Sequence, residues 1–543
     1  MHTPGLSTGC ELMVRPSTVA RAGTGMVRGR QVVLAPDVRI EPLIRQWAAW
    51  LMTLDPVNAA MYLVGHQRPI LQSFLRHRDR HVAAAKDDRT AGGLFANLSA
   101  QQGGNVQRWL DDGEVTDSST LVVGAALLDL VKSGGGSAAS VLSGGVERVH
   151  DPTGGESSQS IRLLRPVLQR SIEPGTESVA VWPGVARPHF LNTPRLTDDQ
   201  RLLHVDSAFD SDQLGELLRL RHSPAPIEVA LAALGLDRAG DHSAVAALLR
   251  PVEAPAAEGE HIAQTCIDFL GHCSVLFRDS GTTLLADPIT PPVQDHVGLP
   301  QRLDAVLISH GHPDHLVAEA LLALRDRIDL ALVPATRSDS FADPSLRDCL
   351  LRLGIRNVVE LRPYDQVAVR SATVTALPFQ GEHGGLDIGG KTTWHIRMST
   401  TTLMLAADCA CQEPAAFDGV ADQFGAVDIL LTAMEPRGAL ARWLYGPLVG
   451  RSGIQDRLDG ADADAVLRLA AAVGARQVGI YGCDGPTDAG HLFGRPAPQG
   501  GYERTLDTGE REVDRLRRLA AARKLPIFTL DRPRRITPPP GER

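Results

Sequence analysis

The sequence predicts an α/β protein of two domains: an α+β domain, followed by an αββα sandwich in the C-terminal half. Its 543 residues exceed what one hydrophobic core usually serves. A stretch rich in Pro, Ala and Glu, without periodicity, predicts a linker over residues 250–261. After it, strand patterns come first as hairpins and then alternate with helical patterns. That order is typical of two sheets covered by helices.

The predicted domain limits follow from these changes in pattern. We expect a disordered extension over residues 1–30 and an N-terminal accessory domain, for docking or dimerisation, over residues 31–249. The C-terminal domain is expected over residues 262–535, followed by a disordered tail over 536–543.

Within the N-terminal domain, apolar residues at helical spacing predict three helices. They cover residues 41–54 ("EPLIRQWAAWLMTL"), 59–75 ("AAMYLVGHQRPILQSFL") and 119–132 ("STLVVGAALLDLVK"). A short strand is predicted before them at "VVLA", residues 32–35.

Composition excludes several classes of protein. With 43% hydrophobic and 22% charged residues the chain is an ordinary globular one, and no apolar run approaches the ~20 residues that cross a bilayer. A net charge of −9 argues against a nucleic-acid binder, so we expect neither nucleic acid nor membrane as a partner. The seven cysteines are scattered and contain no CxxC, which favours a reducing compartment, the cytoplasm.

The main chemical signal is a cluster of metal-ligand residues. The apolar strand "AVLIS" ends directly at His310, and the next five residues contain His312, Asp314 and His315 before a helical pattern begins. This spacing lets one loop serve two neighbouring metal ions, with His310 and His312 at one and Asp314 and His315 at the other. Imidazoles suit zinc, iron or manganese, and the carboxylate favours iron or manganese at the second ion.

The motif HxHxDH after an apolar strand resembles the signature of the metallo-β-lactamase fold. The segment "GHCSVLFRDSGTTLLADP" is similar to the opening hairpins of that fold. The resemblance implies three more ligands: one for the first metal, a bridging carboxylate, and a last imidazole for the second metal. Asp408, which ends the strand "TLMLAAD", is the candidate bridge, and His491, beyond the strand "QVGIYG", is the candidate last imidazole.

The remaining ligand comes from the loop "FQGEHGG", which offers Glu382 and His383. His383 would give a histidine-rich site suited to zinc and a bound hydroxide. Glu382 would give a carboxylate-rich pair similar to oxygen-activating di-iron sites. The residues alone leave both alternatives open.

The whole chain resembles the di-iron β-hydroxylases of nonribosomal peptide assembly lines, the chloramphenicol-biosynthesis type. The order of ligand residues is similar, and "PVNAAMYLVGHQRPILQSFL" and "RPHFLNTPRL" resemble segments of that family's N-terminal domain. The resemblance favours Glu382 over His383. It implies this ligand set: His310, His312, Asp314, His315, Glu382, Asp408 and His491.

The same resemblance implies a non-haem monooxygenase with two iron ions and no catalytic residue beyond the metal ligands. It would use O2 and external electrons to β-hydroxylate an amino acid held as a thioester on a peptidyl carrier protein or thiolation domain, in antibiotic biosynthesis. Because no nucleotide-binding motif occurs, a reductase or ferredoxin would deliver the electrons. The resemblance is also compatible with a homodimer.

Two other functions are weighed against this one. A dinuclear zinc hydrolase of the same fold, a thioesterase or lactonase with two zinc ions, is the main alternative. An N-terminal docking or dimerisation module around a degenerate metal site is the second, and the retained ligand-type residues argue against it.

Weaker features receive weaker expectations. His395 in "TTWHIRM" either orients a ligand or is a structural histidine, and the sequence does not choose. Cys409 and Cys411 flank the bridging aspartate and are expected to pack rather than bind metal. His272 is left out of the ligand set. The basic stretch 515–535 is by default a solvated helix face, with carrier docking as the alternative.

Overall fold

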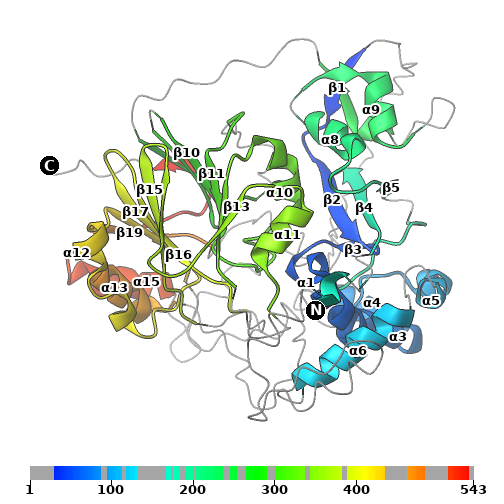
Figure 1. Ribbon diagram of the computed structural model, residues 1–543, viewed down its shortest axis with the longest axis horizontal. Helices are drawn as coiled ribbons and strands as arrows, with labels where there is room; N and C mark the ends of the chain where they lie inside the picture. Colours follow the sequence, from blue (N-terminus) through cyan, green and yellow to red (C-terminus); the bar gives the residue numbers. More distant parts are fainter. Residues whose placement is uncertain are drawn as a thin grey trace, which may run out of the picture.

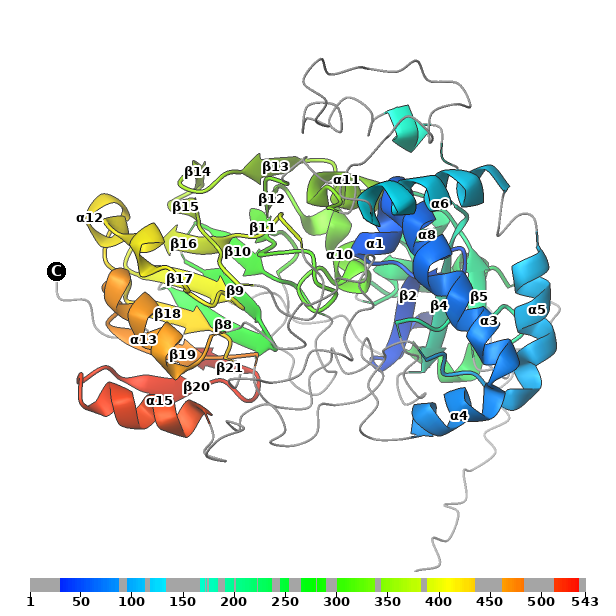
Figure 2. The same ribbon diagram turned by 90° about the horizontal axis from the view of Figure 1, so that it is seen from below.

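In the computed structural model, helices α10 (Ala318–Leu324) and α11 (Leu346–Arg352) lie between an N-terminal part and a sandwich of two seven-stranded sheets (Figures 1 and 2). The structure describes residues 30–86, 95–112, 118–132, 167–170, 172, 175–183, 191–199, 202–221, 223–236, 245–252, 265–279, 281–289, 300–336, 343–381, 388–434, 461–482 and 512–536.

The N-terminal part contains two small antiparallel sheets. The first has the order β3-β2-β4-β5 and the second the order β6-β1-β7. Their strands are β1 (Gln31–Leu34), β2 (Val38–Ile44), β3 (Trp47–Ala48), β4 (Glu177–Pro183), β5 (Leu203–Asp206), β6 (Ala225–Pro226) and β7 (Leu249–Pro251).

The N-terminal part also contains helices. They are α1 (Leu51–Leu54), α2 (Pro56–Tyr62), the π-helical turn η1 (Leu63–Gln67), α3 (Arg68–Arg76), α4 (Arg78–Lys86), η2 (Ala100–Gln102), α5 (Gly103–Asp111), α6 (Ser118–Lys132), α8 (Asp212–Arg219), α9 (Ile227–Ala233) and η4 (Val245–Ala247). Asp55 caps α2 by accepting a hydrogen bond from Asn58 N at 3.0 Å, and Pro56 follows at the first helical position. The helices predicted over 59–75 and 119–132 are therefore confirmed.

The helix predicted over residues 41–54 is wrong. Most of that segment is the end of β2, a turn and β3, and only Leu51–Leu54 is helical. Nearly every residue of β2 is buried, so its sequence lacks the alternation that marks a half-buried strand. The turn places Arg45 and Gln46 at φ of 50° and 68°, without the glycine that usually announces such a turn.

The first sheet of the sandwich has the order β13-β12-β11-β10-β9-β8-β21. Strands β10 to β13 are parallel to one another, whereas β9, β8 and β21 continue the sheet as antiparallel neighbours. The bounds are β8 (Cys266–Gly271), β9 (Ser274–Arg278), β10 (Thr283–Ala286), β11 (Ala305–Leu307), β12 (Ala331–Pro334), β13 (Val358–Leu361) and β21 (Arg534–Ile536).

The second sheet has the order β14-β15-β16-β17-β18-β19-β20, antiparallel up to β17 and parallel from there on. Its strands are β14 (Gln366–Val369), β15 (Ala372–Leu377), β16 (Thr393–Arg397), β17 (Thr402–Ala407), β18 (Ile429–Thr432), β19 (Gln477–Ile480) and β20 (Ile527–Thr529).

The two sheets bury one apolar core between them, which includes Phe277 and Trp394. Helices α10 and α11, with the short turn η5 (Arg325–Arg327), cover the outer side of the first sheet. The outer side of the second sheet is covered by η6 (Pro414–Phe417), α12 (Val420–Phe424), α13 (Ala463–Ala472) and α15 (Glu512–Ala521). This is the αββα order that the sequence predicts.

Two predicted limits differ slightly from the observed strands. Arg250 and Pro251, assigned to the linker, belong to β7, and Ile536, assigned to the tail, pairs with Ile267 in β8. The domain limits as a whole remain predictions. Within the described part of the chain, no helix combines the length and apolar character needed to cross a membrane.

Candidate metal centre

The candidate site lies at one edge of the sandwich, where strands of both sheets end. Residue 287 follows β10, the loop 308–317 follows β11, Asp408 follows β17 and Tyr481 follows β19. Because the carboxyl ends of parallel strands meet at one edge, residues distant in sequence come together there.

The two histidines expected at the first metal lie side by side. His310 Nε2 is 3.1 Å from His312 Nδ1, and both side chains are buried. On the other side of the His310 ring, Nδ1 lies 2.9 Å from Ser309 Oγ, whose own hydrogen is donated to Asp287 Oδ2 at 2.7 Å. His310 Nδ1 therefore donates to the serine, which leaves the lone pair of Nε2 directed at the site.

His315 directs its Nε2 atom at the carboxylates of the site. Its Nδ1 donates to Asp287 Oδ2 at 2.8 Å, while its buried Nε2 makes no hydrogen bond among the described residues. Burial by itself lowers the pKa of His315, but Asp408, Asp314 and Asp287 together raise that pKa well above its ordinary value. The surroundings of Nε2 thus favour a positive charge.

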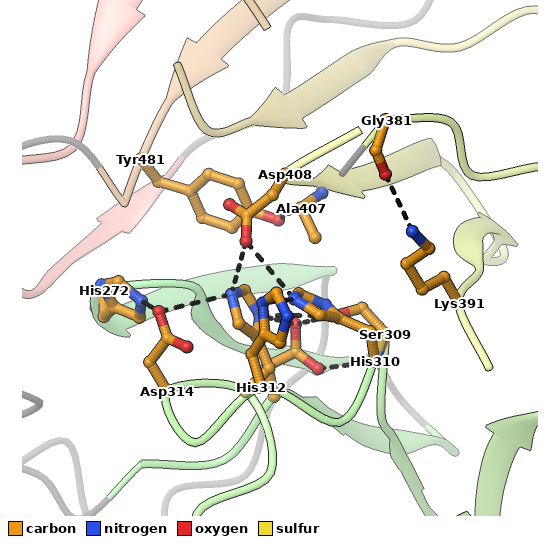
Figure 3. A network of polar contacts seen from close by, with 12 residues as sticks. His272, Ser309, His310, His312, Asp314, Gly381, Lys391, Ala407, Asp408 and Tyr481 are labelled. Carbon is orange, nitrogen blue, oxygen red and sulfur yellow. Dashed lines mark hydrogen bonds and ion pairs between the residues drawn. The ribbon is translucent and has the colours of Figure 1, made fainter. Parts of the chain in front are cut away.

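The Asp408 carboxylate reaches towards two imidazoles of the site (Figure 3). Its Oδ2 is 3.5 Å from His310 Nε2 and 3.0 Å from His315 Nε2. One carboxylate oxygen thus faces a nitrogen of each predicted metal position, as a bridging ligand requires.

Asp314 is held by a residue that the sequence analysis left out of the ligand set. His272 Nε2 donates to Asp314 Oδ2 at 2.9 Å, and the same oxygen is 3.7 Å from His315 Nε2. Burial by itself raises the pKa of Asp314, but His315 and the hydrogen bond from His272 hold that pKa well below its usual range. Asp314 is therefore a carboxylate oriented by a neighbouring imidazole, as is common around metal sites.

These donors fit a pair of metal ions. His310, His312 and Asp408 offer ligand atoms that all lie within 4.8 Å of one another, and a second such group consists of His315 with His272 and Cys273, which are not predicted ligands. His315 Nε2 lies beside the carboxylates of Asp314 and Asp408, at 3.7 Å and 3.0 Å. Mixed imidazole nitrogen and carboxylate oxygen donors suit iron.

A strained turn directs Asp408 into the site. Ala407, the residue before it, has φ of 46°, and the register of β17 and β18 shifts between Leu405 and Ala407. The buried hydroxyl of Tyr481 accepts a hydrogen bond from Ala407 N at 3.2 Å (Figure 3). Burial raises the pKa of Tyr481 well above its ordinary value, so the residue is a neutral phenol. Bulges and left-handed residues of this kind often redirect side chains at functional sites.

The segment that leads towards residue 382 contacts Lys391 and the ring of His310. Lys391 Nζ donates to Gly381 O at 2.8 Å and lies 5.5 Å from the centre of the Phe379 ring (Figure 3 shows Lys391 and Gly381). The Phe379 ring in turn lies 5.4 Å from that of His310. Gly381 has φ of 99°, a conformation that favours glycine.

Gln380 fastens the same segment to the chain beyond Asp408. Its backbone oxygen accepts from Ala410 N at 2.8 Å. Its side chain accepts from Glu413 N at 2.7 Å and donates to Glu413 O at 2.9 Å.

Five of the seven predicted ligands are thus brought together: His310, His312, Asp314, His315 and Asp408. The other two, Glu382 and His491, lie outside the described residues, as does His383. The full ligand set therefore remains a prediction.

Two weaker features have structural roles. His395 Nε2 bonds Gly425 O at 3.1 Å and its ring lies near that of Phe424, so of the two alternatives the structural one holds. Cys409 and Cys411 are fully buried in the core under α12 and α13 and pack as expected.

The basic C-terminal stretch is largely engaged within the protein. Arg515 pairs with Asp464 and Glu512, and Arg535 donates to Asp268 Oδ1 at 2.8 Å. Arg517 pairs with Asp514 at 3.0 Å on an exposed face of α15. These pairs favour the default interpretation, a solvated helix face.

Besides His272, four residues that hold the site were not predicted from the sequence: Asp287, Ser309, Lys391 and Tyr481. Among these four residues the sequence marks only Asp287, through the Asp-Pro that follows the strand pattern "TTLLA". Ser309 and Tyr481 sit at strand ends as ordinary residues, and nothing in the sequence marks Lys391.

Comparison with known proteins agrees with this geometry. The family model "Diiron non-heme beta-hydroxylase N-terminal domain" matches residues 33–134 and 138–251, and the model "Beta-lactamase superfamily domain" matches residues 266–439. The 4-amino-L-phenylalanyl-(CmlP-peptidyl-carrier-protein) 3-hydroxylase of Streptomyces venezuelae is 30% identical over 485 residues, which cover 82% of this chain and 90% of that protein.

Solved structures agree with the sequence comparison. The crystal structure of CmlA, a di-iron β-hydroxylase from Streptomyces venezuelae, matches with a TM-score of 0.75 at 25% identity, covering 94% of this chain and 99% of that one. A point variant of CmlA matches with a TM-score of 0.75 at 26% identity, covering 93% and 99%. The cofactor of this family is a pair of iron ions, which sets aside the zinc alternative. The chain belongs to the di-iron non-haem β-hydroxylases with a metallo-β-lactamase fold.

Proposed function

We propose that this enzyme β-hydroxylates an amino acid held as a thioester on a peptidyl carrier protein, with O2 and electrons from an external donor. Its relative from Streptomyces venezuelae is named for such a reaction on a carrier-bound 4-amino-L-phenylalanyl group.

For the metal ligands we propose His310, His312 and Glu382 at the first iron, and Asp314, His315 and His491 at the second, bridged by Asp408. The observation that carries this assignment is the place of Asp408 Oδ2, within 3.5 Å of His310 Nε2 and 3.0 Å of His315 Nε2. Glu382 is preferred to His383 because the family is a di-iron one and carboxylates stabilise higher iron oxidation states.

The iron pair, when bound, supplies O2 activation and removal of a hydrogen atom from the substrate β-carbon. The protein's own side chains fix the donor atoms. Ser309 and Asp287 set the tautomers of His310 and His315, and Tyr481 fixes the turn before Asp408. The histidines are at most 1% exposed, so bulk water is excluded from their side of the site.

Three partners complete the proposal. The carrier protein presents the substrate, and a reductase or ferredoxin delivers electrons, because the chain has no nucleotide-binding motif of its own. The third partner is a second copy of the chain, with which it forms a homodimer. We place the reaction in the cytoplasm, in keeping with the five described cysteines, which are all free thiols.

The direct test combines iron-loaded enzyme, a chemical reductant, O2 and carrier proteins charged with different aminoacyl groups. We expect at least one charged carrier to gain the mass of one oxygen atom, and the free amino acid to react far more slowly. Release of the amino acid from the carrier without added oxygen would instead support the hydrolase and overturn the proposal.

The choice between the two adjacent loop residues needs its own pair of variants. Glu382→Ala is expected to lose one iron per chain and all hydroxylation, whereas His383→Ala is expected to keep both irons. Iron analysis and the optical spectrum of each variant separate the two. The opposite result would assign the ligand to His383.

A further inference from the structure

Leu51 of the accessory domain contacts Gly311, the second residue of the loop 310–315 that contains the predicted ligands. The side chain of Leu51, from α1, lies so close to Gly311 that a Cβ at this glycine would be 2.6 and 2.8 Å from the two Leu51 δ-carbons. Leu346 Cδ2, from α11, would lie 3.1 Å away on the same side. Gly311 separates His310 from His312. Between these two predicted ligands the loop therefore packs directly against a side chain of the accessory domain.

Leu51 has little room to move away. It is 1% exposed and belongs to a core cluster that joins the accessory domain to α10 and α11. Its backbone oxygen accepts a contact from Cys349 Sγ at 3.9 Å, and the preceding Trp50 packs edge-on against Tyr62 at 5.3 Å. A packed side chain of this kind transmits a volume change to its neighbours instead of absorbing it.

A second contact holds the far end of the same loop. Glu319, four residues after His315 in α10, is 5% exposed. Its carboxylate accepts from Ile40 N at 3.1 Å and pairs with Arg39 at 2.9 Å and Arg221 at 3.2 Å. All three partners come from the accessory domain.

We propose that the accessory domain helps to hold the iron site in shape. Leu51 and the contacts of Glu319 position the loop 310–315. This rests on the proposed function in that the loop holds iron. It goes further, because it assigns the N-terminal domain a part in metal retention that is separate from docking or dimerisation.

Substituting Gly311 by Ala tests the Leu51 contact. The added methyl group would press on Leu51, displace the loop and release iron to a chelator about tenfold faster than wild type. Gly390→Ala is the matched control, since a Cβ there meets its nearest neighbour, Thr336 Oγ1, at an ordinary 3.5 Å. That control should retain iron like the wild type.

The decisive step is rescue by a second substitution in the other domain. Leu51→Ala removes the atoms that the new methyl group would meet, so Gly311→Ala with Leu51→Ala should recover wild-type iron release and optical spectrum. The double variant should still unfold at a lower temperature, because a buried leucine is missing. Recovery of the iron site without recovery of stability separates positioning from general folding.

Glu319→Gln tests the second contact, with Glu216→Gln in the exposed pair with Arg219 as its control. It should speed iron release, whereas the control should not. Iron release in Gly311→Ala like that of the wild type, or failure of Leu51→Ala to restore it, would overturn the inference and leave the proposed function standing. A wild-type chain that binds no iron would instead overturn the proposed function.

Discussion

Asp287 binds both ends of the metal-binding loop, since it accepts His315 Nδ1–H at 2.8 Å and Ser309 N–H at 2.7 Å. Asn at this position keeps the shape but replaces one carboxylate oxygen by an NH2 group, which cannot accept from His315. We expect Asp287→Asn to weaken retention of the second iron by about 10–100-fold, measured as iron per chain against increasing chelator.

The control for that variant is Asp268→Asn, because Asp268 is also fully buried but pairs with Arg278 and Arg535 at the far edge of the sheet. It should lower the unfolding temperature and leave iron retention unchanged. Equal iron loss in both variants would show that Asp287 acts through overall stability.

Lys391→Met should loosen the first iron. The variant removes the charged donor to Gly381 O, a bond of about 1.5–3 kcal/mol, and so frees the segment that leads to residue 382. The expected result is a changed optical spectrum and loss of up to one iron per chain. Lys86→Met, at an exposed lysine of α4, should change neither. An unaltered spectrum in Lys391→Met would argue that Gln380 holds this segment without help.

Tyr481→Phe should alter the bridge without emptying the site. The variant leaves Ala407 N–H buried without its acceptor, at a cost of about 1–3 kcal/mol, and releases the strained turn before Asp408. We expect a lower unfolding temperature, two irons retained, and a shifted spectrum that reports the altered bridge. A shift in unfolding temperature with a spectrum identical to wild type would limit Tyr481 to a packing role.

Stability should fall in mild acid because several histidines are buried in the neutral form. Burial lowers the pKa of His81, and its Nδ1 accepts from Ala96 N at 3.1 Å, which a protonated ring could not do. Burial also lowers the pKa of His204 and of His395. The unfolded chain takes up these protons near pH 6.5 and the folded protein does not, so the contribution of these three histidines to stability is full above that pH and decreases as the pH falls.

Chemical denaturation at several pH values measures this dependence. His81→Gln, whose amide oxygen can still accept from Ala96 N–H, should reduce the slope of unfolding free energy against pH below 6.5. Each such histidine contributes at most about 1.4 kcal/mol per pH unit. A slope equal to that of wild type would mean that His81 is protonated in the folded state.

The sequence predicted the sandwich well because its strands and helices carry local signals. Strand ends that bear His310 and Asp408 are apolar runs stopped by a ligand residue, a pattern that needs no knowledge of the fold. The first domain was harder, since β2 is buried throughout and its turn uses Arg45 and Gln46 in place of glycine.

The supporting residues could not be predicted for a different reason. Asp287 and His315 lie 28 residues apart, and the two are joined only because β10 and β11 end at the same edge. Lys391 acts on a backbone oxygen, a role that any residue type can receive. Such pairings depend on tertiary structure, which local patterns do not encode.

β21, the last strand among the described residues, has a consequence for synthesis on the ribosome. β21 pairs with β8, and Arg535 reaches Asp268 across 267 positions of sequence. Until residues 534–536 have been synthesised, the edge of β8 lacks its described partner strand, and an open strand edge invites pairing with other nascent chains. During that interval the buried Asp268 can pair with Arg278 but not with Arg535. Deletion of β21 would therefore show first as aggregation during expression, before any effect on chemistry.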